Sequence, residues 1–565
     1  MAEKKGDLKV IIIGGVATGP KTGATLARRM PDANITLFQK EENVSYGTCG
    51  LPYFASGDIG SFDELTKTSY GVKRDADFFK RSKDFDIVAG AKVIKIDKTK
   101  KEVSVELLSS GEVSIHTYDK LVIAVGANPS PPPFPVPECN IVRSFTRPED
   151  AICFRKMAEQ GQIGNVTIIG GGFIGCEMAE AVVSMWGIDA TIIEKENQLL
   201  PYILDPEMAH LVELEMKKQG VTLLTNQSVE NIELDIEEKP EIRLGSGDEI
   251  ISDFVFLCLG VRPEISLAKA CGLKIGEFGG ITVNKSMQTS DLNIFAGGDC
   301  IENISQLTKK PIYMPMGSLA NRHGRVIAEN IAGNKVKFPG VLGTFLVKVF
   351  DTNVGAVGLT EKAAISANFK VDTVLGSFPD IPDFYPEGGT FTLKMVYEKK
   401  TEKLLGLQAV GNGDICRRID TFSALLQKKA TLNDLLDFEH GYAPPYSEAV
   451  DSLHHMAGMA KAKEAGFCFA KAEETKELDI TWLDVREAHE VESSPWPHVL
   501  DGYNQVLVNI PLNDLKERLN ELDPQNKIMV ICRRGPRSYQ ASVILKNAGY
   551  KNVYIIGGGT KVIQP

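Results

Sequence analysis

The segment from Val166 to Glu194 places the strongest constraint on the fold. The strand-like run Val166-Thr-Ile-Ile169 leads into Gly170-Gly-Gly172-Phe-Ile-Gly175, and a second run, Ala190-Thr-Ile-Ile193, ends at Glu194. Glycines at this spacing between a strand and a helix are typical of a βαβ unit that holds a dinucleotide pyrophosphate at the helix N-terminus. Glu194 stands where a carboxylate accepts hydrogen bonds from an adenosine ribose and would repel a 2′-phosphate. We therefore expect NADH, and Lys195 beside the acid keeps NADPH possible.

A less complete copy of the pattern lies at the start of the chain. The apolar run 9–13 is followed by Gly14-Gly-Val-Ala-Thr-Gly19, a helical stretch, and a second strand-like run at 35–38. Val16 replaces the middle glycine, and the second run ends at Gln39 rather than at an acid. The copy predicts a second dinucleotide-binding unit, although glycine-rich strand-to-helix turns also serve plain packing.

Composition excludes several classes of protein. At 565 residues the chain is long enough for three or four domains. The net charge of -11 argues against nucleic acid as a partner. None of the ten cysteines forms a CxxC pair, so we expect no metal site. No apolar run is long enough to span a membrane, and the polar start of the chain predicts a cytoplasmic protein without membrane contact.

Two further segments bracket the second unit. Leu121-Val-Ile-Ala-Val-Gly-Ala127 is strand-like and contains Gly126, and the run 289–300 ends in Gly-Gly-Asp299-Cys. An isolated Gly-Asp is most often a turn. With both units and both segments in this order, residues 1 to about 455 resemble the flavin- and nicotinamide-dependent disulfide reductase superfamily.

This resemblance implies the cofactors, and the stretch from Val341 to Met456 resembles the interface domain of the superfamily, which implies a homodimer. FAD is expected on the first unit, with Asp299 near its ribityl chain, and a reduced nicotinamide on the second. The residues expected to bind FAD are Gly14, Gly15, Gly19, Gln39, Lys40, Gly126 and Asp299, and those expected to bind the nicotinamide cofactor are Gly170, Gly172, Gly175 and Glu194.

Cys49 is the expected redox centre. The segments Ser45-Tyr-Gly-Thr-Cys-Gly-Leu-Pro-Tyr53 and Gly441-Tyr-Ala-Pro-Pro-Tyr-Ser447 are similar to the coenzyme A-disulfide reductase branch. That branch uses one cysteine beside the flavin and forms a mixed disulfide with the sulfur of the substrate. A cysteine just before a helix start is expected to have a lowered pKa and to act as a thiolate. The alternative is an inert buried cysteine.

The same resemblance implies a groove for coenzyme A and two tyrosines near the cysteine of the other subunit. Lys21 and Arg28 lie seven residues apart, so they share a helix face and could meet phosphates, unless that face is simply solvated. Thr48 replaces the asparagine usual in the branch. The expected groove residues are Lys21, Thr25, Arg28, Ser45, Thr48 and Asn321, and the tyrosines are Tyr385 and Tyr442, each able to protonate a leaving thiolate or to pack at an interface.

The last part of the chain carries a second sulfur motif. Ile480-Thr-Trp-Leu-Asp-Val-Arg486 and Ile528-Met-Val-Ile-Cys-Arg-Arg-Gly-Pro-Arg-Ser538 resemble a rhodanese domain. A strand, Cys532, four residues, Arg537 and a helix form a loop whose N–H groups can hold a thiolate or persulfide. Phosphatases share this loop shape, so phosphate transfer stays open.

The predicted fold class is therefore α/β, with two Rossmann-like domains, an α+β dimerisation domain and an α/β rhodanese domain. The predicted ranges are an FAD domain at 1–150 and 276–335, an NAD(P)H domain at 151–275, a dimerisation domain at 336–460, a linker at 461–476 and a rhodanese domain at 477–565.

We interpret the chain as an NADH-dependent FAD enzyme that reduces the sulfane sulfur of coenzyme A persulfide or polysulfide through Cys49, with Cys532 handling persulfide sulfur. Coenzyme A would be a substrate or a bound ligand. The alternatives are a coenzyme A-disulfide reductase, an NADH oxidase or peroxidase, and a flavin redox sensor or sulfur carrier. Superfamily members that reduce oxygen or peroxide carry a histidine in the first glycine loop, where this chain has Ala17-Thr18.

Overall fold

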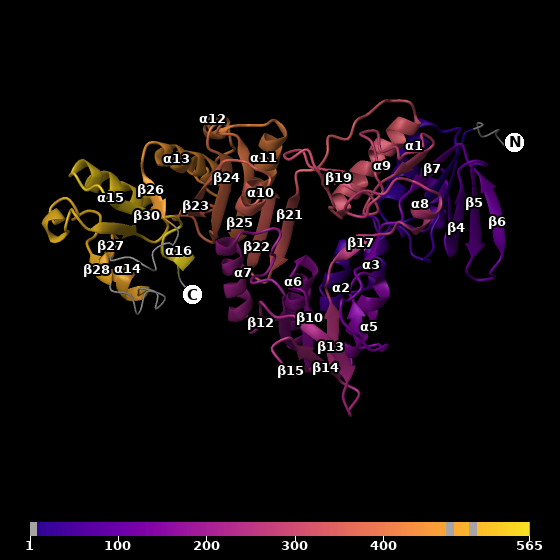
Figure 1. Cartoon of the computed structure of the whole chain (residues 1–565), viewed down its shortest axis with the longest axis horizontal. Helices are drawn as coiled ribbons and strands as arrows, with labels where there is room; N and C mark the ends of the chain where they lie inside the picture. Colours follow the sequence, from indigo (N-terminus) through magenta and orange to yellow (C-terminus); the bar gives the residue numbers. More distant parts are fainter. Residues whose placement is uncertain (1–7, 471–479, 496–504, 564–565) are drawn as a thin grey trace. The chain divides into compact units, whose positions relative to one another are not determined.

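The strand predicted at residues 9–13 forms the centre of a parallel sheet in the computed structural model of the chain, which describes residues 8–470, 480–495 and 505–563 (Figure 1). The model divides into two compact units: residues 1–195 with 220–341, and residues 196–219 with 342–565. No helix in these described ranges is both long enough and apolar enough to cross a membrane.

The first sheet of the first unit has the order β18-β7-β1-β2-β3, and its paired strands run parallel. Parallel strands covered on both faces are continuously apolar, and Ile12 at the centre of β1 is fully buried. The strands are β1 (Lys9–Ile13), β2 (Asn34–Phe38), β3 (Asp86–Val88), β7 (Lys120–Ile123) and β18 (Ile294–Ala296). The helices α1 (Thr18–Arg29) and α9 (Gly317–Ile331) pack against each other.

The second sheet of this unit has the order β12-β11-β10-β16-β9 and is also parallel. The ring of Phe154 packs edge to face against the ring of Phe254 and at a tilt against that of Phe256. The rings of Phe254 and Phe256 are tilted relative to each other. The elements are β9 (Val142–Ser144), α5 (Pro148–Glu159), β10 (Asn165–Ile169), α6 (Phe173–Glu180), β11 (Asp189–Ile193), β12 (Thr222–Leu224) and β16 (Phe254–Leu257).

Shorter elements complete the first unit. Two antiparallel sheets are formed by β4 (Ala91–Asp97), β5 (Glu102–Leu107) and β6 (Val113–Thr117), and by β13 (Val229–Leu234), β14 (Pro240–Leu244) and β15 (Glu249–Ile251). The ribbons β8 (Ala127–Pro129) with β17 (Val261–Pro263) and β19 (Asn303–Ile304) with β20 (Pro311–Ile312) are antiparallel. The remaining helices are η1 (Thr48–Gly50), α2 (Leu51–Ser56), α3 (Phe62–Thr66), α4 (Ala76–Lys83), a π-helical turn (Ala181–Met185) and α8 (Ser266–Ala270).

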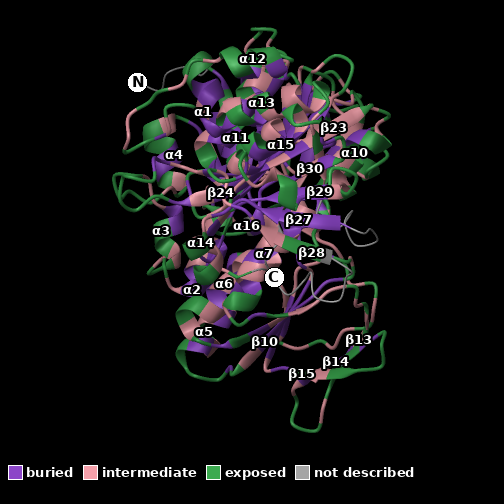
Figure 2. Ribbon diagram, turned by 90° about the vertical axis from the view of Figure 1, so that its left-hand side faces the viewer, coloured by how far each residue is buried: buried purple, intermediate pink, exposed green. Residues whose placement is uncertain are grey.

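The second unit contains two further sheets. An antiparallel sheet of order β21-β22-β25-β24-β23 is followed by a parallel sheet of order β26-β30-β29-β27-β28. In Figure 2, β27 is buried along its whole length. The strands are β21 (Thr344–Val349), β22 (Thr352–Gly358), β23 (Val371–Pro379), β24 (Thr390–Glu398), β25 (Leu404–Gly411), β26 (Cys468–Ala470), β27 (Ile480–Asp484), β28 (Gln505–Asn509), β29 (Lys527–Ile531) and β30 (Val553–Ile556). The helices are α7 (Pro206–Lys218), α10 (Glu361–Ser366), α11 (Cys416–Gln427), α12 (Leu432–Asp437), α13 (Ser452–Glu464), α14 (Ala488–Ser493), η5 (Leu519–Glu521), α15 (Pro536–Asn547) and α16 (Thr560–Ile563).

The structure shows which elements surround three of the predicted domain boundaries. The linker expected at 461–476 begins with the end of α13, because its Lys and Ala residues favour a helix. It continues with β26, which pairs with β30. Residues 471–476 lie outside the described ranges. Residues 336–341, assigned to the dimerisation domain, pack into the core of the first unit through Phe338 and Val341. Residues 196–219, assigned to the NAD(P)H domain, belong to the second unit.

A buried ionic cluster explains why residues 196–219 belong there. Lys394 on β24 is 1% exposed, and its Nζ lies 2.9 Å from Asp205 Oδ2, 2.7 Å from Glu207 Oε1 and 2.8 Å from Glu361 Oε2. Gln408 on β25 donates to Asp205 Oδ2 and accepts from its backbone N–H. Burial would lower the pKa of Lys394, but the charges of Asp205 and Glu207 reverse this, and the net shift is upward.

We expect Lys394→Met to lower the free energy of unfolding by about 3–5 kcal/mol at pH 7.5, because the buried Asp205 and the half-buried Glu207 and Glu361 would lose the cation that they share. Lys399→Met is the matched control: its exposed ammonium lies 3.7 Å from Asp372, and such a pair contributes about 0–1 kcal/mol. Urea denaturation measures both, and equal stability of the two variants would contradict the role of the cluster.

Candidate active sites around Cys49 and Cys532

The second glycine turn has the geometry of a dinucleotide cradle. Gly170 has φ +110°, and a Cβ atom on it would lie 2.4 Å from the carbonyl oxygen of Cys258. A Cβ atom on Gly175 would lie 2.0 Å from the carbonyl oxygen of Gly170, so the start of α6 packs directly against the turn. A Cβ atom on Gly172 would meet nothing within 4 Å, which leaves the space that a pyrophosphate needs. The predicted glycines therefore fit a nicotinamide dinucleotide.

The first glycine turn repeats this construction. A Cβ atom on Gly14, at φ +106°, would lie 2.1 Å from the carbonyl oxygen of Ala124, and one on Gly19 would lie 1.9 Å from the carbonyl oxygen of Gly14. Gly15 N–H donates to Gln39 Oε1 at 2.6 Å. In the second unit Gly171 N–H donates to Glu194 Oε2 at 2.7 Å. Both turns therefore contain the same hydrogen bond from a glycine N–H to a side-chain oxygen. Gln39 supplies that oxygen in the first turn, and Glu194 supplies it in the second.

Gly126 and Asp299 follow β7 and β18, which are neighbours in the first sheet. Gly126 has φ +74°, and no atom stands within 4 Å of its Cβ position. Burial raises the pKa of Asp299 to about 6, and Tyr313 donates its hydroxyl to the Asp299 carbonyl at 3.0 Å. Gly126 and Asp299 both lie at the carboxyl ends of parallel strands, which is the edge at which such sheets bind ligands. The side chain of Lys40, which was also expected to bind FAD, is exposed. This edge fits FAD.

Cys49 lies in η1, directly before α2, as the sequence predicted. Its Sγ stands 3.8 Å from the Cβ position of Gly317, the first residue of α9. The expected lowering of its pKa is wrong for this environment: burial, then the charges of Glu177 and Asp299, raise the pKa of the Cys49 thiol. The N-terminus of α9 acts in the opposite direction.

Glu177 was not identified from the sequence, although it follows the second glycine motif by two residues. It lies on α6, and burial, then the charge of Glu180, raise its pKa to about 7. The same two carboxylates, after burial, raise the pKa of Tyr53 to about 12. The pKa of the Cys49 thiol is therefore raised although the residue is exposed, by partial burial of the thiol and then by the charges of Glu177 and Asp299.

We expect Glu177→Gln to lower the pKa of the Cys49 thiol. Above pH 7 Glu177 carries its charge and opposes the thiolate, and the amide removes that charge. The pH dependence of iodoacetamide labelling of Cys49 in the reduced holoenzyme, followed by peptide mass spectrometry, measures the shift. Glu180→Gln is the control, because it lowers the pKa of Glu177 and leaves the Cys49 curve in place or moves it to higher pH. A Glu177→Gln curve identical to that of the wild type would contradict the assignment.

The residues expected to bind coenzyme A lie on two packed helices and the segment before η1. Thr25 on α1 is buried and accepts from the exposed Arg28 Nη2 at 3.3 Å. Asn321 on α9 is exposed and donates to the Gly317 carbonyl at 2.9 Å. Ser45, at φ +50°, donates its N–H to the Gly15 carbonyl at 2.8 Å, and Thr48 is exposed.

Gly324 permits this helix packing and was missed by the sequence analysis. A Cβ atom on it would lie 2.7 Å from the Thr18 carbonyl and 2.9 Å from Lys21 Cβ. Lys21 on α1 is therefore adjacent to the turn of α9 that follows Asn321. Small residues at 317, 320 and 324, spaced for one helix face, were the signal in the sequence.

Cys532 ends β29 at the start of a short loop before α15. Its side chain is 1% exposed, and Gly535 N–H, at φ +124°, donates to Cys532 Sγ at 3.0 Å. Thr560 N–H donates to the Cys532 carbonyl at 2.9 Å, and a Cβ atom on Gly559 would lie 2.2 Å from that oxygen. The loop therefore directs a backbone donor at the sulfur, as an anion cradle does.

Two arginines of this loop are held by carboxylates. Arg537 binds Glu490 through both terminal nitrogens, and this pairing lowers the pKa of Glu490 to about 2. Arg534 binds Asp383 with Nη2–Oδ1 at 3.1 Å, and Arg533 is exposed. The Glu490 carboxylate thus neutralises part of the positive charge beside Cys532, and phosphate transfer stays open as the alternative chemistry of this loop.

Tyr385 and Tyr442 lie in loops of the second unit. Tyr385, between β23 and β24, is 39% exposed, and its N–H donates to the Pro382 carbonyl. Tyr442, between α12 and α13, is half-exposed. Asp383, which binds Arg534, belongs to the same loop as Tyr385, a link between the two predicted sites that the sequence did not indicate.

Comparison with known proteins matches three family models. Residues 8–313 match the pyridine nucleotide-disulphide oxidoreductase model, residues 344–454 its dimerisation domain, and residues 469–564 the rhodanese-like domain. The chain therefore belongs to the pyridine nucleotide-disulphide oxidoreductase family and is an FAD- and NAD(P)H-dependent oxidoreductase with a rhodanese-like domain. This confirms the predicted fold class.

Three relatives show the range of activities named among similar proteins. The structure of an NAD-dependent persulfide reductase from A. fulgidus is 37% identical with a TM-score of 0.93, covering 98% of this chain and 100% of that one. An NAD(P)H coenzyme A polysulfide/persulfide reductase from Pyrococcus horikoshii is 34% identical, covering 80% of this chain and 98% of its own length. An NADH oxidase from Methanocaldococcus jannaschii is also 34% identical, covering 81% and 99%.

Proposed function

We propose that this chain is an NADH-dependent reductase of sulfane sulfur carried on coenzyme A, working through a mixed disulfide on Cys49. None of the ten cysteines is disulfide-bonded, and η1 and α2 contain no second cysteine beside Cys49. This observation carries the proposal, because a lone redox cysteine needs a substrate that brings the second sulfur. The glycine cradle before Cys49 and the α1–α9 surface beside it supply sites for FAD and for coenzyme A.

The reaction balances in two steps. The Cys49 thiolate attacks the inner sulfur of coenzyme A persulfide, forming a Cys49–S–S–coenzyme A disulfide and releasing hydrosulfide. Two electrons and a proton then cleave this disulfide to the Cys49 thiolate and coenzyme A thiol. FAD supplies the relay that brings these electrons from NADH. The carboxylates around Cys49 oppose a free thiolate, so proton release from Cys49 is coupled to substrate arrival.

Residues of the chain itself bind the two cofactors and coenzyme A and protonate the leaving thiolate. Lys21 and Arg28 bind phosphates of coenzyme A, and Thr25, Ser45, Thr48 and Asn321 line its path. Glu194 accepts from the ribose and disfavours NADPH by about 1–3 kcal/mol, since its negative charge would face the 2′-phosphate. In a homodimer, Tyr385 and Tyr442 approach the cysteine of the other subunit and protonate the leaving thiolate. The proposed setting is the cytoplasm.

The rhodanese-like domain supports persulfide over disulfide as the substrate. The persulfide reductase structure from A. fulgidus covers 98% of this chain, so that protein shares the rhodanese-like domain with it. In a plain disulfide reductase or an oxidase, a cysteine such as Cys532, whose loop can hold a persulfide, would have no role in the reaction. The proposed sequence is therefore loading of sulfur through Cys532 and reduction at Cys49, with coenzyme A as the carrier.

We expect Cys49→Ser to bind FAD and to be bleached by NADH, but to lower turnover with coenzyme A persulfide by about a hundredfold or more, because the mixed disulfide cannot form. The measurement is anaerobic NADH consumption with coenzyme A persulfide, coenzyme A disulfide, polysulfide and peroxide in parallel. Cys416→Ser, which removes another exposed thiol, is the control. Highest kcat/KM with peroxide, or substantial persulfide turnover by Cys49→Ser, would reject the proposal.

We expect the Cys532→Ala variant to reduce presynthesised coenzyme A persulfide at the wild-type rate. The variant should no longer reduce polysulfide in an assay where sulfur must first be transferred from polysulfide to coenzyme A. The reason is that Cys532 alone sits in the backbone cradle that stabilises a persulfide. Cys468→Ser, an exposed thiol of the same sheet, should leave both rates unchanged. Wild-type rates of Cys532→Ala with both substrates would remove Cys532 from the reaction path.

A further inference from the structure

Arg418 on α11 is a buried arginine that contacts the ends of the two loops carrying Tyr385 and Tyr442. Its side chain is 1% exposed, and its guanidinium carbon lies 4.9 Å from the centre of the Phe391 ring. A buried guanidinium costs free energy unless its donors are bonded, so its partners are expected to be held in place by the fold. None of the reactions above uses this group.

The first partner of Arg418 lies at the end of the Tyr442 loop, which runs from α12 to α13. Arg418 Nε and Nη2 both bind Asp451 Oδ2, at 3.1 and 3.0 Å. The other carboxylate oxygen of Asp451 accepts from the Leu453 N–H at 3.0 Å and so caps α13. Because Asp451 is also buried, salt screens this pair little, and the pair fixes the point at which the loop enters α13.

The second partner lies at the start of the Tyr385 loop, which runs from β23 to β24. Arg418 Nη2 donates to the Asp380 carbonyl at 3.4 Å. The Asp380 carboxylate accepts from the Gly389 N–H at 2.7 Å, and the Asp380 N–H donates to the Gly389 carbonyl at 3.0 Å. The two ends of this loop are therefore bonded to each other, and Arg418 contacts the closed end.

The turn that leads into α11 reinforces this longer contact. Arg418 Nη1 donates to the Asp414 carbonyl at 2.8 Å, and the Asp414 N–H donates to Asp380 Oδ2 at 3.2 Å. Arg418 therefore holds the Tyr385 loop both directly and through Asp414.

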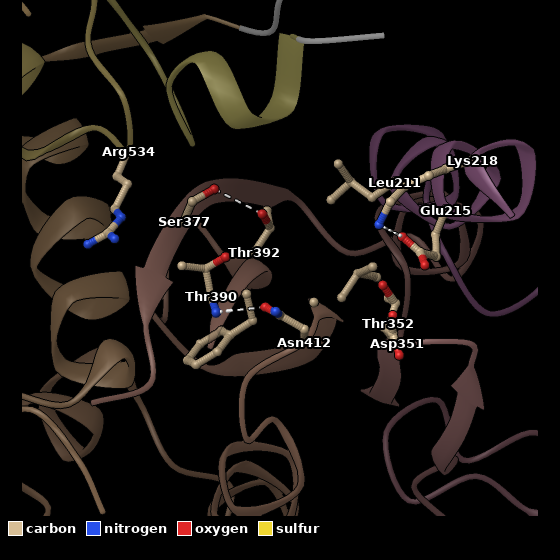
Figure 3. Close-up of a pocket in the computed structure, with 13 residues that line it drawn as sticks. Leu211, Glu215, Lys218, Asp351, Thr352, Ser377, Thr390, Thr392, Asn412 and Arg534 are labelled. Carbon is tan, nitrogen blue, oxygen red and sulfur yellow. Dashed lines mark hydrogen bonds and ion pairs between the residues drawn. The ribbon is translucent and has the colours of Figure 1, made fainter. Parts of the chain in front are cut away.

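The same turn is also bonded to the start of β24. Figure 3 shows Asn412 Oδ1 accepting from the Thr390 N–H, at 2.9 Å. A Cβ atom on Gly389 would lie 2.5 Å from Gly413 Cα, so a side chain at 389 would push the loop away from the turn. The backbone thus brings the base of the Tyr385 loop against the residues that precede Arg418.

Arg417, the preceding residue on α11, contacts one loop instead of two. Its Nη2 donates to the Tyr446 carbonyl at 2.7 Å, in the loop of Tyr442. Among the described residues it makes no hydrogen bond to the loop of Tyr385. Two neighbouring arginines therefore form a matched pair for experiments.

We propose that Arg418 is a positioning residue that fixes the two tyrosine loops relative to each other and so sets the spacing of Tyr385 and Tyr442. This rests on the role proposed above for the two tyrosines in protonating the leaving thiolate. Tyr385 is 39% exposed and Tyr442 50%, so anchors at the loop ends, more than burial, set their places. Displacing a reacting group by about 1 Å can cost about a hundredfold in rate, so Arg418 affects turnover without touching the substrate.

Hydrogen–deuterium exchange of the full-length FAD-loaded protein, read from peptides covering 380–389 and 441–450, tests the anchoring without any substrate. Arg418→Lys keeps a charge for Asp451, but a single ammonium cannot also reach the carbonyls on the other side. Exchange should therefore become about threefold faster or more in both loops.

Two control variants separate this effect from others. Arg417→Gln should accelerate exchange in 441–450 only, because its one loop contact is with Tyr446. Lys394→Met removes the cation of a buried ionic cluster in the same unit and should leave exchange in both loops as in the wild type. Faster exchange in Arg418→Lys is then distinguished from a general loss of stability.

Turnover with coenzyme A persulfide gives the kinetic readout. Arg418→Lys should lower kcat about tenfold and keep KM within about twofold, because it displaces the tyrosines and not the substrate. Reduction of FAD by NADH should keep its wild-type rate. In the Tyr385→Phe/Tyr442→Phe background, Arg418→Lys should cause no further loss, since the groups through which it acts are absent.

Asp451→Asn is the second variant if Arg418→Lys fails to fold. It keeps a capping residue for α13, removes the charge that Arg418 binds, and should likewise accelerate exchange in both loops. Wild-type exchange in either loop of the folded variant overturns the proposal, and so does a full loss of kcat in the double-phenylalanine background. Wild-type kcat of Tyr385→Phe/Tyr442→Phe would instead reject the proton-donating role of the tyrosines, and exchange would still decide the anchoring.

Discussion

Both cofactor sites depend on glycines that let the backbone pass close to a neighbouring segment. At Gly14 and Gly170 a positive φ turns the chain against the next strand of the sheet, and at Gly19 and Gly175 the following helix packs onto that turn. A side chain at any of these four positions would push the helix N-terminus away from the place of the pyrophosphate. Glu177 lies on α6, the helix that packs onto the second of these turns, so the same contacts position its carboxylate.

Cys49 and Cys532 lie in opposite electrostatic environments. Cys49 stands among carboxylates that raise its pKa, which suits a thiol that must stay protonated until a disulfide substrate arrives. Cys532 receives a backbone N–H and lies in a loop with three arginines, which suits a group that must remain an anion once it carries sulfur. In the proposed reaction the sulfur held at Cys532 passes to coenzyme A and leaves as hydrosulfide when Cys49 attacks the coenzyme A persulfide, so Cys49 itself never has to hold a persulfide anion.

The sequence was sufficient where function depends on local chain geometry. The glycine spacing at 170–175, the strand at 9–13 and the loop from Cys532 to Arg537 predicted their structures because neighbouring residues make the contacts. It was insufficient where contacts join distant segments. Lys394 meets Asp205, Glu207 and Glu361 only after folding, so the place of residues 196–219 in the second unit could not be read from a pattern. The charge of Glu177 beside Cys49 was missed for the same reason, and with it the sign of the pKa shift.

Two arginines of the Cys532 loop are paired with carboxylates from other segments. In an anion cradle the backbone N–H groups provide the shape, and the final arginine decides which anion stays bound. Here Glu490 accepts from both terminal nitrogens of Arg537, so its carboxylate neutralises part of the positive charge beside Cys532. Arg534 binds Asp383, in the loop that carries Tyr385. This pair therefore joins the Cys532 loop to the segment between β23 and β24.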